Sequence, residues 1–292
     1  MNNYKQYLDQ LLLATAENGA SDLHISPGHY PAIRISSNLV QVSGTQILDP
    51  ETTSGLVFEL ISPEKRDRFL SEKELDFSYE YGGKYRFRVN AYHTRGGMAM
   101  SLRLIPNEIK TVEELNLPPI VRIFSRLSQG FVLVVGPNGH GKSTTLASLV
   151  DLINRERAEK IITIEDPVEY IFSPNKSIID QREIYQDTIS FHTAIRSTFR
   201  QNANVILVGE MRDYEAMSAA VTAAETGHLV MASLHTNSAS QTIERIIDSF
   251  PADQQNQIRS QLANTLIGIV SQRLVPRIEG GLMPAVEIMI AN

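Results

Sequence analysis

The chain has 292 residues, and 42% of them are hydrophobic, which is enough for the cores of one large domain or two ordinary ones. Lys and Arg number 27 against 33 Asp and Glu, and the resulting net charge of −6 argues against a domain that binds nucleic acid through bulk positive charge. The absence of cysteine excludes disulfides and cysteine-ligated zinc and fits a reducing cytoplasm.

The N-terminal third combines one helical pattern with a series of short strand-like segments. Apolar residues recur at helical spacing over 4–17, which predicts a helix that Gly19 ends. Strand-like segments follow in "SDLHIS", "AIRISSNLV", "LDFSYEY", "YRFRVNAYHT" and "GMAMSLRLI", and Gly82 and Gly83 mark a hairpin turn. We therefore expect a small α+β domain with a mostly antiparallel sheet over residues 1–106. The polar, proline-bracketed segment "PNEIKTVEELNLPP" then predicts a linker over 107–119.

From residue 120 onward, buried strands alternate with helices. The apolar runs "GFVLVVG", "KIITIEDP", "NVILVGE" and "HLVMASLHT" predict strands covered on both faces. The segments "DTISFHTAIRSTFRQ", "RDYEAMSAAVTAAETG" and "SASQTIERIIDSF" predict helices, the second with Asp213 as its N-cap and Gly227 as its stop. This alternation is typical of a parallel α/β sheet and predicts a second domain over 120–292.

The segment "GPNGHGKST" has the spacing of a phosphate-binding P-loop, and it follows a predicted strand and opens a predicted helix. Its glycines allow a tight turn whose backbone N–H groups face phosphate oxygens, and the helix adds its positive dipole end. Lys142 can reach the β- and γ-phosphates, and the Ser143 hydroxyl can bind Mg²⁺. The predicted nucleotide-binding residues of the loop are Gly136, Pro137, Asn138, Gly139, His140, Gly141, Lys142, Ser143 and Thr144. The imidazole of His140, at a free position of the motif, could face solvent, a neighbouring chain or the nucleotide.

The run "NVILVGEMRD" ends an apolar strand at Glu210, and Gly209 stands where an aspartate commonly holds magnesium. At the carboxyl end of a parallel strand, Glu210 can act as general base or orient the water that attacks the γ-phosphate. It could also act on the magnesium ion through water. The alternative is a strand-end carboxylate that pairs with Arg212.

Further carboxylates, Glu165, Asp166 and Glu169, cluster in "ITIEDPVEY". Beside a phosphate site they would repel one another unless a cation or a basic residue lies among them. This favours a role in a magnesium site or in positioning water, and the alternative is a turn or helix cap before Pro167.

His228 and His235 stand at the two ends of one predicted strand, in "TGHLVMASLHT". A spacing of seven residues at period two places them on opposite faces and too far apart to share a metal ion. His235 lies at the carboxyl end, near the expected chemistry, and could sense the γ-phosphate. His228 is placed for capping or for an interface.

These motifs, in this order, resemble the secretion ATPases that drive type II secretion and type IV pili, the GspE/PulE-like superfamily. The segments "GASDLHIS", "RFRVNAY", "ITIEDPVEY", "ILVGEMRD" and "TAAETGHLVMASLHT" are especially similar to the PilT-like retraction ATPases, and the resemblance covers nearly the whole chain. It implies an α/β fold: a RecA-like P-loop ATPase core, with a mostly parallel sheet flanked by helices, preceded by a small α+β PAS-like N-terminal domain. It also implies a hexameric ring.

The resemblance assigns roles to particular residues of this sequence. Glu210 becomes the catalytic carboxylate, because glycine before this glutamate is usual in the family, and Glu169 and His235 join it as catalytic groups. Glu165, Asp166 and His228 complete the acidic and histidine boxes around the nucleotide. The N-terminal domain of the family contributes arginines that help close the site on the phosphates, and the matching positions here are Arg86, Arg88, Arg95 and Arg103. Such arginines would make hydrolysis depend on domain position.

The implied function is an ATP-hydrolysing motor, with ATP and Mg²⁺ as cofactors, that powers type IV pilus retraction and twitching motility. Extension ATPases of the family carry an additional N-terminal region and a tetracysteine zinc insertion, so the lack of cysteine favours retraction. Retraction members continue into C-terminal helices that are missing after "AVEIMIAN", which we expect to spare ATP binding and to bear on retraction. The alternatives are an accessory retraction ATPase, a type IV secretion ATPase of the same family, or a weakly hydrolysing nucleotide-binding ring component.

The expected partners are further copies of the chain, in a homohexamer, and an inner-membrane platform protein that connects the ring to pilin. The start of the chain lacks the pattern of a secretory signal, and its apolar runs are far too short to span a bilayer. We therefore expect a cytoplasmic protein, peripheral at the inner membrane through its partners, with no direct membrane insertion and no nucleic-acid partner.

Overall fold

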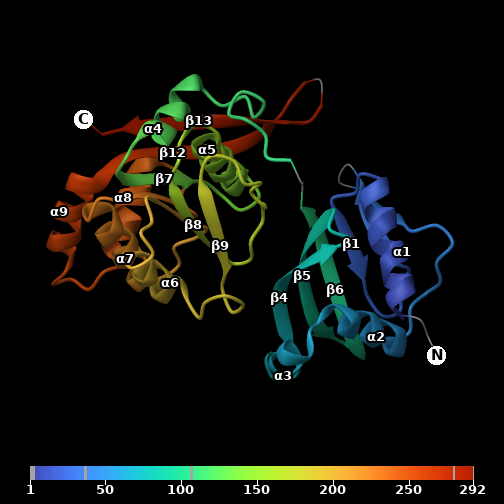
Figure 1. Ribbon diagram of the computed structural model, residues 1–292. Helices are drawn as coiled ribbons and strands as arrows, with labels where there is room; N and C mark the ends of the chain where they lie inside the picture. The colour runs from blue at the N-terminus through green and yellow to red at the C-terminus, as the bar shows by residue number, and fades with distance from the viewer. Residues whose placement is uncertain (1–3, 36–37, 106–107, 279, 292) are drawn as a thin grey trace. The chain divides into compact units, whose positions relative to one another are not determined.

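The computed structural model describes residues 4–35, 38–105, 108–278 and 280–291, and the chain divides into two compact units, 1–107 and 108–292 (Figure 1). The expected domain boundary at 106 and the first residue of the expected linker lie outside the described residues. The rest of that segment belongs to the second unit, where Val112 and Leu117 are buried in the core. Because burial of these two side chains is favourable, residues 108–119 pack against the second unit and are not a free tether.

The first unit is an antiparallel sheet in the order β3-β2-β1-β6-β5-β4. Its strands are β1 (Asp22–Ile25), β2 (Ala32–Ile35), β3 (Asn38–Gln41), β4 (Glu74–Tyr81), β5 (Tyr85–Thr94) and β6 (Gly97–Ile105). Its described helices are α1 (Tyr4–Glu17), α2 (Pro50–Leu60) and α3 (Pro63–Glu72). The helix expected over 4–17 and the turn at Gly82 and Gly83 are confirmed. The helices α2 and α3 were not among the predicted elements.

The two faces of this sheet differ in chemistry because side chains alternate along each strand. Leu23, Val89 and Leu102 are fully buried on the face that packs with α1 and α2. The neighbouring residues in sequence, among them Arg88 and Arg103, point to the opposite face, which is polar. The first unit therefore has one apolar face that holds its core and one face rich in charged groups.

The second unit contains a sheet in the order β13-β12-β7-β11-β10-β8-β9. Its strands are β7 (Gly130–Val135), β8 (Lys160–Glu165), β9 (Ile178–Glu183), β10 (Val205–Val208), β11 (Leu229–Leu234), β12 (Leu266–Pro276) and β13 (Leu282–Ile290). All pairs are parallel except β12 with β13. The predicted class, a mostly parallel sheet preceded by a small N-terminal α/β domain, is confirmed.

Helices cover both faces of this sheet (Figure 1). The described helical segments are η1 (Pro119–Arg122), α4 (Ile123–Arg126), α5 (Lys142–Glu156), α6 (Phe191–Thr198), α7 (Tyr214–Glu225), α8 (Ala239–Asp248) and α9 (Gln255–Thr265). The core on one face includes α4 and α5, and the core on the other includes α6 to α9. Strands covered on both sides explain why these runs are continuously apolar.

Capping side chains fix where several of these helices begin. Asp213 accepts a hydrogen bond from the backbone N–H of Ala216, which confirms it as the N-cap of α7. The helix predicted over 187–201 is shorter, because Ser190 caps α6 and Thr188 forms a bridge with Ile184. In the part of the chain that is described, no helix has the length and apolar character needed to cross a membrane.

Candidate functional site

The P-loop leaves the sheet at the end of β7 and leads directly into α5. Gly136, Gly139 and Gly141 have φ of 150°, 75° and 82°, backbone conformations that residues other than glycine rarely adopt. At Gly136 a Cβ would also lie 2.2 Å from the carbonyl oxygen of Gln272 on β12. The loop can therefore turn its N–H groups inward toward an anion only because these positions carry glycine.

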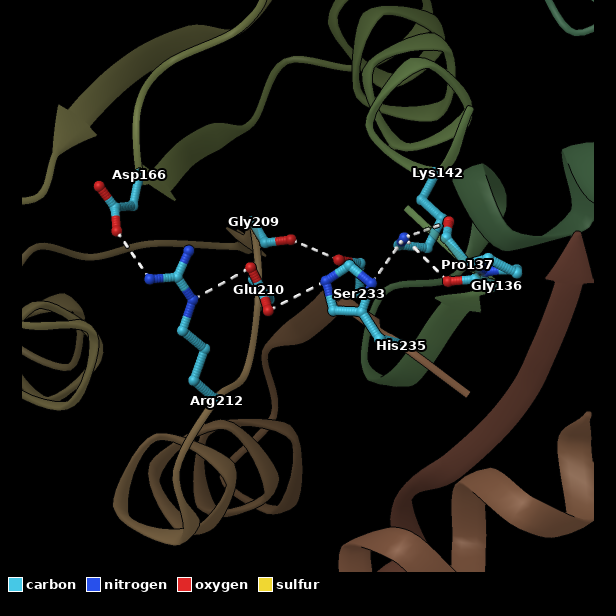
Figure 2. Close-up of polar contacts among 9 residues, drawn as sticks. All are labelled: Gly136, Pro137, Lys142, Asp166, Gly209, Glu210, Arg212, Ser233 and His235. Carbon is cyan, nitrogen blue, oxygen red and sulfur yellow. Dashed lines mark hydrogen bonds and ion pairs between the residues drawn. The ribbon is translucent and has the colours of Figure 1, made fainter. Parts of the chain in front are cut away.

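Lys142, the first residue of α5, lies inside the loop. Its Nζ donates to the carbonyl oxygens of Gly136 and Pro137, both at 2.9 Å, and lies 3.2 Å from Nδ1 of His235 (Figure 2). Burial lowers the pKa of the ammonium, and the carboxylates of Glu210 and Glu169 oppose that shift. The hydrogen-bond partners of this buried cation among the described residues, two carbonyl oxygens and an imidazole, carry no negative charge. Its positive charge is therefore available to a phosphate group.

Polar contacts continue from Lys142 through His235 to Glu210 (Figure 2). The Nε2 atom of His235 lies 3.0 Å from Oε1 of Glu210. Because Lys142 is a donor only, Nδ1 of His235 accepts and the ring proton lies on Nε2, from which it is donated to Glu210. The prediction that His235 lies near the chemistry at the end of its strand therefore agrees with the geometry.

Arg212 ties the other oxygen of Glu210 to the acidic segment. Its Nε lies 3.1 Å from Oε2 of Glu210, and its NH1 lies 3.1 Å from Oδ2 of Asp166. Glu210 thus contacts both His235 and the arginine partner expected under the alternative interpretation. Arg212 is also the basic residue that repulsion among these carboxylates requires.

Gly209 has a structural reason to be glycine. Its N–H donates to the carbonyl of Ile164, and a Cβ would lie 3.3 Å from both that oxygen and the Cα of Glu165 on β8. The hydroxyl of Ser233 on β11 donates to the Gly209 carbonyl at 2.6 Å. A side chain at this position, such as that of aspartate, would crowd β8, and the carboxylate present at this strand end is that of the next residue, Glu210.

Glu165 is turned into the protein interior. Its Oε1 accepts from the Thr163 hydroxyl at 2.6 Å and its Oε2 from the Glu169 N–H at 3.3 Å. Burial raises the pKa of the Glu165 carboxyl from 4.5 to about 7, and these hydrogen bonds only partly oppose the shift. Glu165 therefore holds the acidic segment in shape from within, whereas Asp166 faces Arg212.

Two further polar side chains of the loop, those of Thr144 and His140, contact protein groups. The Thr144 hydroxyl lies 2.8 Å from that of Tyr170, which follows the acidic segment. Nδ1 of His140 accepts a hydrogen bond from the backbone N–H of Leu274 on β12. The Nδ1 side of the His140 imidazole therefore packs against a strand of its own unit.

His228 lies at the start of β11, away from the P-loop. Six residues of strand separate it from His235, which corresponds to about 20 Å. Its Nδ1 donates to the Ala223 carbonyl at 2.9 Å, and its ring packs against Phe199 with 5.6 Å between centroids. Within one chain, His228 therefore caps the end of α7 and does not join the loop, in line with the structural interpretation of its position.

The structure brings Arg86, Arg88 and Arg103 onto the polar face of the first unit. Arg88 and Arg103 are direct cross-strand partners, and Arg86 is two residues from Arg88 on β5. Nε of Arg103 lies 3.0 Å from Oδ1 of Asp22, and NH2 of Arg86 donates to Ser78 at 2.7 Å. Arg95 is exposed on the turn between β5 and β6 and is not part of this group.

Residues that the sequence analysis missed support the loop from neighbouring elements. The Gln272 side chain donates to the His140 carbonyl at 2.9 Å and accepts from the Thr145 hydroxyl at 2.8 Å. Tyr170 and Ser233 contact Thr144 and Gly209, as described above. The one local signal for Gln272 is its place in a short polar run, Ser271 to Arg273, inside the mostly apolar stretch "LIGIVSQRLV". Nothing in the local pattern indicates its partners, more than a hundred residues away.

This P-loop lies between a parallel strand and a helix, and a carboxylate that contacts a histidine lies two strands away at the same edge of the sheet. The arrangement defines a P-loop ATPase with a RecA-like core. The family model described as "Type II/IV secretion system protein" matches residues 2–281. The chain belongs to this family and is a PilT-like ATPase within it.

Relatives and solved structures agree with this assignment. The chain is 42% identical to the type IV pilus retraction ATPase PilT of Pseudomonas aeruginosa over 98% of this chain and 83% of that protein. It is 40% identical to the type IV pilus ATPase PilU of the same organism, over 97% of this chain and 74% of that protein. A crystal structure of the pilus retraction motor PilT with bound ADP superposes with a TM-score of 0.92 at 44% identity, covering 97% of this chain and 83% of that one.

Proposed function

We propose that this chain is a motor that retracts type IV pili, as a homohexameric ring that couples ATP hydrolysis to domain motion. The observation that carries the proposal is the continuous contact from Lys142 through His235 to Glu210, at the carboxyl ends of neighbouring parallel strands. In this proposal Lys142 is the phosphate-binding cation and Glu210 is the general base, and their positions at the same edge of the sheet support both roles. The similarity to PilT then selects retraction among the uses of such a core.

In this proposal the chain's own groups divide the work on ATP. The loop N–H groups and the Lys142 ammonium bind the β- and γ-phosphates. Glu210 orients the attacking water and accepts its proton. His235 holds Glu210 in place through its Nε2 and contacts Lys142 through its Nδ1, so that a shift of Lys142 can change the position of Glu210. Glu169, whose charge acts on Lys142, is a further carboxylate near the γ-phosphate.

The donor set fits Mg²⁺. Ser143 offers a hydroxyl at the start of α5, and Glu210 and Glu169 offer carboxylates nearby, all of them oxygen ligands. Among the described residues no group of His, Cys, Asp and Glu forms a dedicated metal cage, which suits an ion that keeps waters and binds through phosphates. When bound, Mg²⁺ supplies neutralising charge to the phosphates. We place Ser143 as its protein ligand and Glu210 behind a water.

The arginines of the first unit extend the proposal to domain motion. Arg86, Arg88 and Arg103 share one face, and we propose that this face closes on the phosphates during the cycle. Positive charge that arrives only on closure stabilises the transition state and makes turnover depend on domain position. Arg95, on the turn between β5 and β6, lies outside this group of arginines. His228 has no part in the proposed closure of this face.

The partners follow from the same proposal. A ring of six copies works at the cytoplasmic side of the inner membrane, through a platform protein that passes the motion to pilin. The similarity to a pilus retraction motor supports the link to pili. A second candidate, an accessory pilus ATPase, has the support of the nearly equal identity to PilU.

The experiment compares ATP hydrolysis by the purified chain with that of Glu210→Gln and of Glu244→Gln, a control on the exposed face of α8. We expect Glu210→Gln to lower kcat by about 100-fold or more while ATP still binds, and Glu244→Gln to match the wild type. Wild-type hydrolysis no faster than that of Glu210→Gln would reject the motor. Restored twitching in bacteria that lack PilT, but not in bacteria that lack PilU, would select retraction over the accessory role.

A further inference from the structure

Strand β12 continues beyond the point where its neighbour β7 ends. The parallel pairing of the two strands stops at Ser271 and Val135, after which β7 becomes the P-loop while β12 runs on to Pro276. On its other edge, β12 stays paired with β13 along this whole stretch. The edge that faces the loop therefore has backbone groups with no strand beside them.

The backbone N–H of Leu274 is one of these groups. Leu274 pairs with Pro284 on β13, and proline has no N–H to exchange with it. In an antiparallel ladder such a non-hydrogen-bonded pair directs its N–H groups away from the partner strand. The Leu274 N–H accordingly points toward the loop, where it donates to Nδ1 of His140 at 2.9 Å.

This contact fixes the state of the imidazole. Nδ1 accepts, so the neutral ring carries its proton on Nε2. A shorter side chain such as serine or threonine ends one atom earlier and cannot place an acceptor where Nδ1 lies. The bulky residue in this loop thus provides an acceptor that a short side chain would lack.

Gln272 makes a second link between the same two segments. Its Nε2 donates to the His140 carbonyl at 2.9 Å, and its Oε1 accepts from the Thr145 hydroxyl on α5 at 2.8 Å. Gln272 is almost completely buried. A Cβ at Gly141 would lie 2.8 Å from Nε2 of Gln272, so the loop and this amide fit closely.

We propose that His140 and Gln272 are positioning residues that bind the P-loop to β12 and hold its backbone ready for phosphate. Neither side chain touches the nucleotide in this proposal. They limit the conformations of the empty loop, so less conformational entropy is lost when phosphate binds. The inference rests on the proposed binding of ATP by this loop, and it adds residues that the P-loop pattern does not contain.

The test uses the full chain and a pair of variants at one position. His140→Phe keeps a ring but removes the acceptor, whereas His140→Asn keeps an acceptor near the position of Nδ1. We expect ADP to bind about tenfold more weakly to His140→Phe and within about threefold of wild type to His140→Asn, measured by calorimetry, which corresponds to the loss or retention of one hydrogen bond. His192→Phe, the same change on α6, is the matched control and should bind ADP as the wild type does.

Amide hydrogen exchange gives a readout that does not depend on nucleotide. The Leu274 N–H should exchange faster in His140→Phe than in wild type, and should remain protected in His140→Asn. If His140→Phe does not fold, Gln272→Met, which removes the other link, should weaken ADP binding about tenfold and leave the Leu274 N–H protected. Equal ADP affinity in wild type, His140→Phe and Gln272→Met would overturn the proposal, and so would an equal loss in His140→Phe and His140→Asn. If wild type itself bound no ADP, the proposed function would fail instead.

Discussion

His235 donates a hydrogen bond from Nε2 to Oε1 of Glu210, across 3.0 Å, while its other ring nitrogen faces Lys142. One imidazole therefore contacts both the group that we propose binds phosphate and the carboxylate that we propose acts on water. A movement of the Lys142 ammonium toward a nucleotide changes what His235 touches, and through it the position of Glu210. Arg212 holds the second oxygen of Glu210 and limits its motion from the other side.

Replacing His235 should separate catalysis from binding. His235→Ala removes a hydrogen bond to a charged carboxylate, which we expect to lower kcat by about 10–100-fold. His235→Gln should retain more activity, because its amide N–H can still donate to Glu210. ADP affinity, measured by calorimetry, should stay within about threefold of wild type in both, since Lys142 keeps its two carbonyl partners on the loop. Equal kcat in His235→Ala and wild type would show that the pair has no role in turnover.

Lys142→Ala should remove nucleotide binding. The ammonium of Lys142 is buried inside the loop, where it contacts two loop carbonyls. The loop contains no other lysine or arginine, so its charge is not replaced. We expect ADP and ATP affinity to fall by about 100-fold or more in calorimetry. Lys176→Ala, at an exposed position of the same unit, should bind as the wild type does. Tight binding of ATP by Lys142→Ala would contradict the assignment of the phosphate site.

Replacing different glycines of the loop by alanine should lower the free energy of unfolding by different amounts. At Gly136, alanine would meet the Gln272 carbonyl oxygen at 2.2 Å in addition to an unfavourable φ, so Gly136→Ala should lower the free energy of unfolding by roughly 3–5 kcal/mol. At Gly139 a Cβ meets nothing within 4 Å, and only the backbone conformation opposes it. Gly139→Ala should therefore cost about 1–2 kcal/mol in urea unfolding. Similar losses for the two variants would contradict the close approach of β7 and β12 at Gly136.

Glu165 should make stability depend on pH. Its pKa is raised from 4.5 to about 7 in the folded protein, so the unfolded chain ionises first as pH rises. The stability that the protonated Glu165 contributes is present below about pH 4.5 and is lost as pH rises through about 7, by an amount on the order of 3 kcal/mol.

The variant Glu165→Gln isolates this effect. Its amide can still bond Thr163 and the Glu169 N–H, but it does not titrate. Urea unfolding at pH 5 and pH 8 should show a larger loss of stability at the higher pH for wild type than for Glu165→Gln. The same pH dependence in both proteins would mean that Glu165 ionises as an ordinary carboxyl.

The effect of replacing an arginine of the first unit on kcat should depend on where that arginine lies. Arg88→Ala and Arg103→Ala remove charges from the shared polar face, and we expect each to lower kcat at least about tenfold with little change in ADP affinity. Arg95→Ala, on the turn at the end of β5, should change kcat less than about twofold. An effect of Arg95→Ala as large as that of Arg88→Ala would mean that the closing face is not the one defined by β5 and β6.

The sequence was sufficient for the parts of the site that depend on short stretches of chain. The spacing of glycines around Lys142 predicts a P-loop because the turn and the helix start are local, and the apolar run before Glu210 predicts a carboxylate at a strand end. The order of buried strands and helices likewise predicts a parallel sheet, because each strand must be covered on both faces.

The contacts between distant segments were decided only by the tertiary structure. That β12 lies beside β7 in one particular register brings Gln272 and Leu274 to the P-loop, and no local pattern specifies this register. The same holds for His235, which the pairing of β11 with β7 places next to Lys142 while it leaves His228 at the far end of the strand. His140 shows the difference most directly. Its place in the motif leaves solvent, a neighbouring chain and the nucleotide open as contacts. Only the structure shows that the neighbouring strand presents a backbone N–H without a ladder partner, which the imidazole binds.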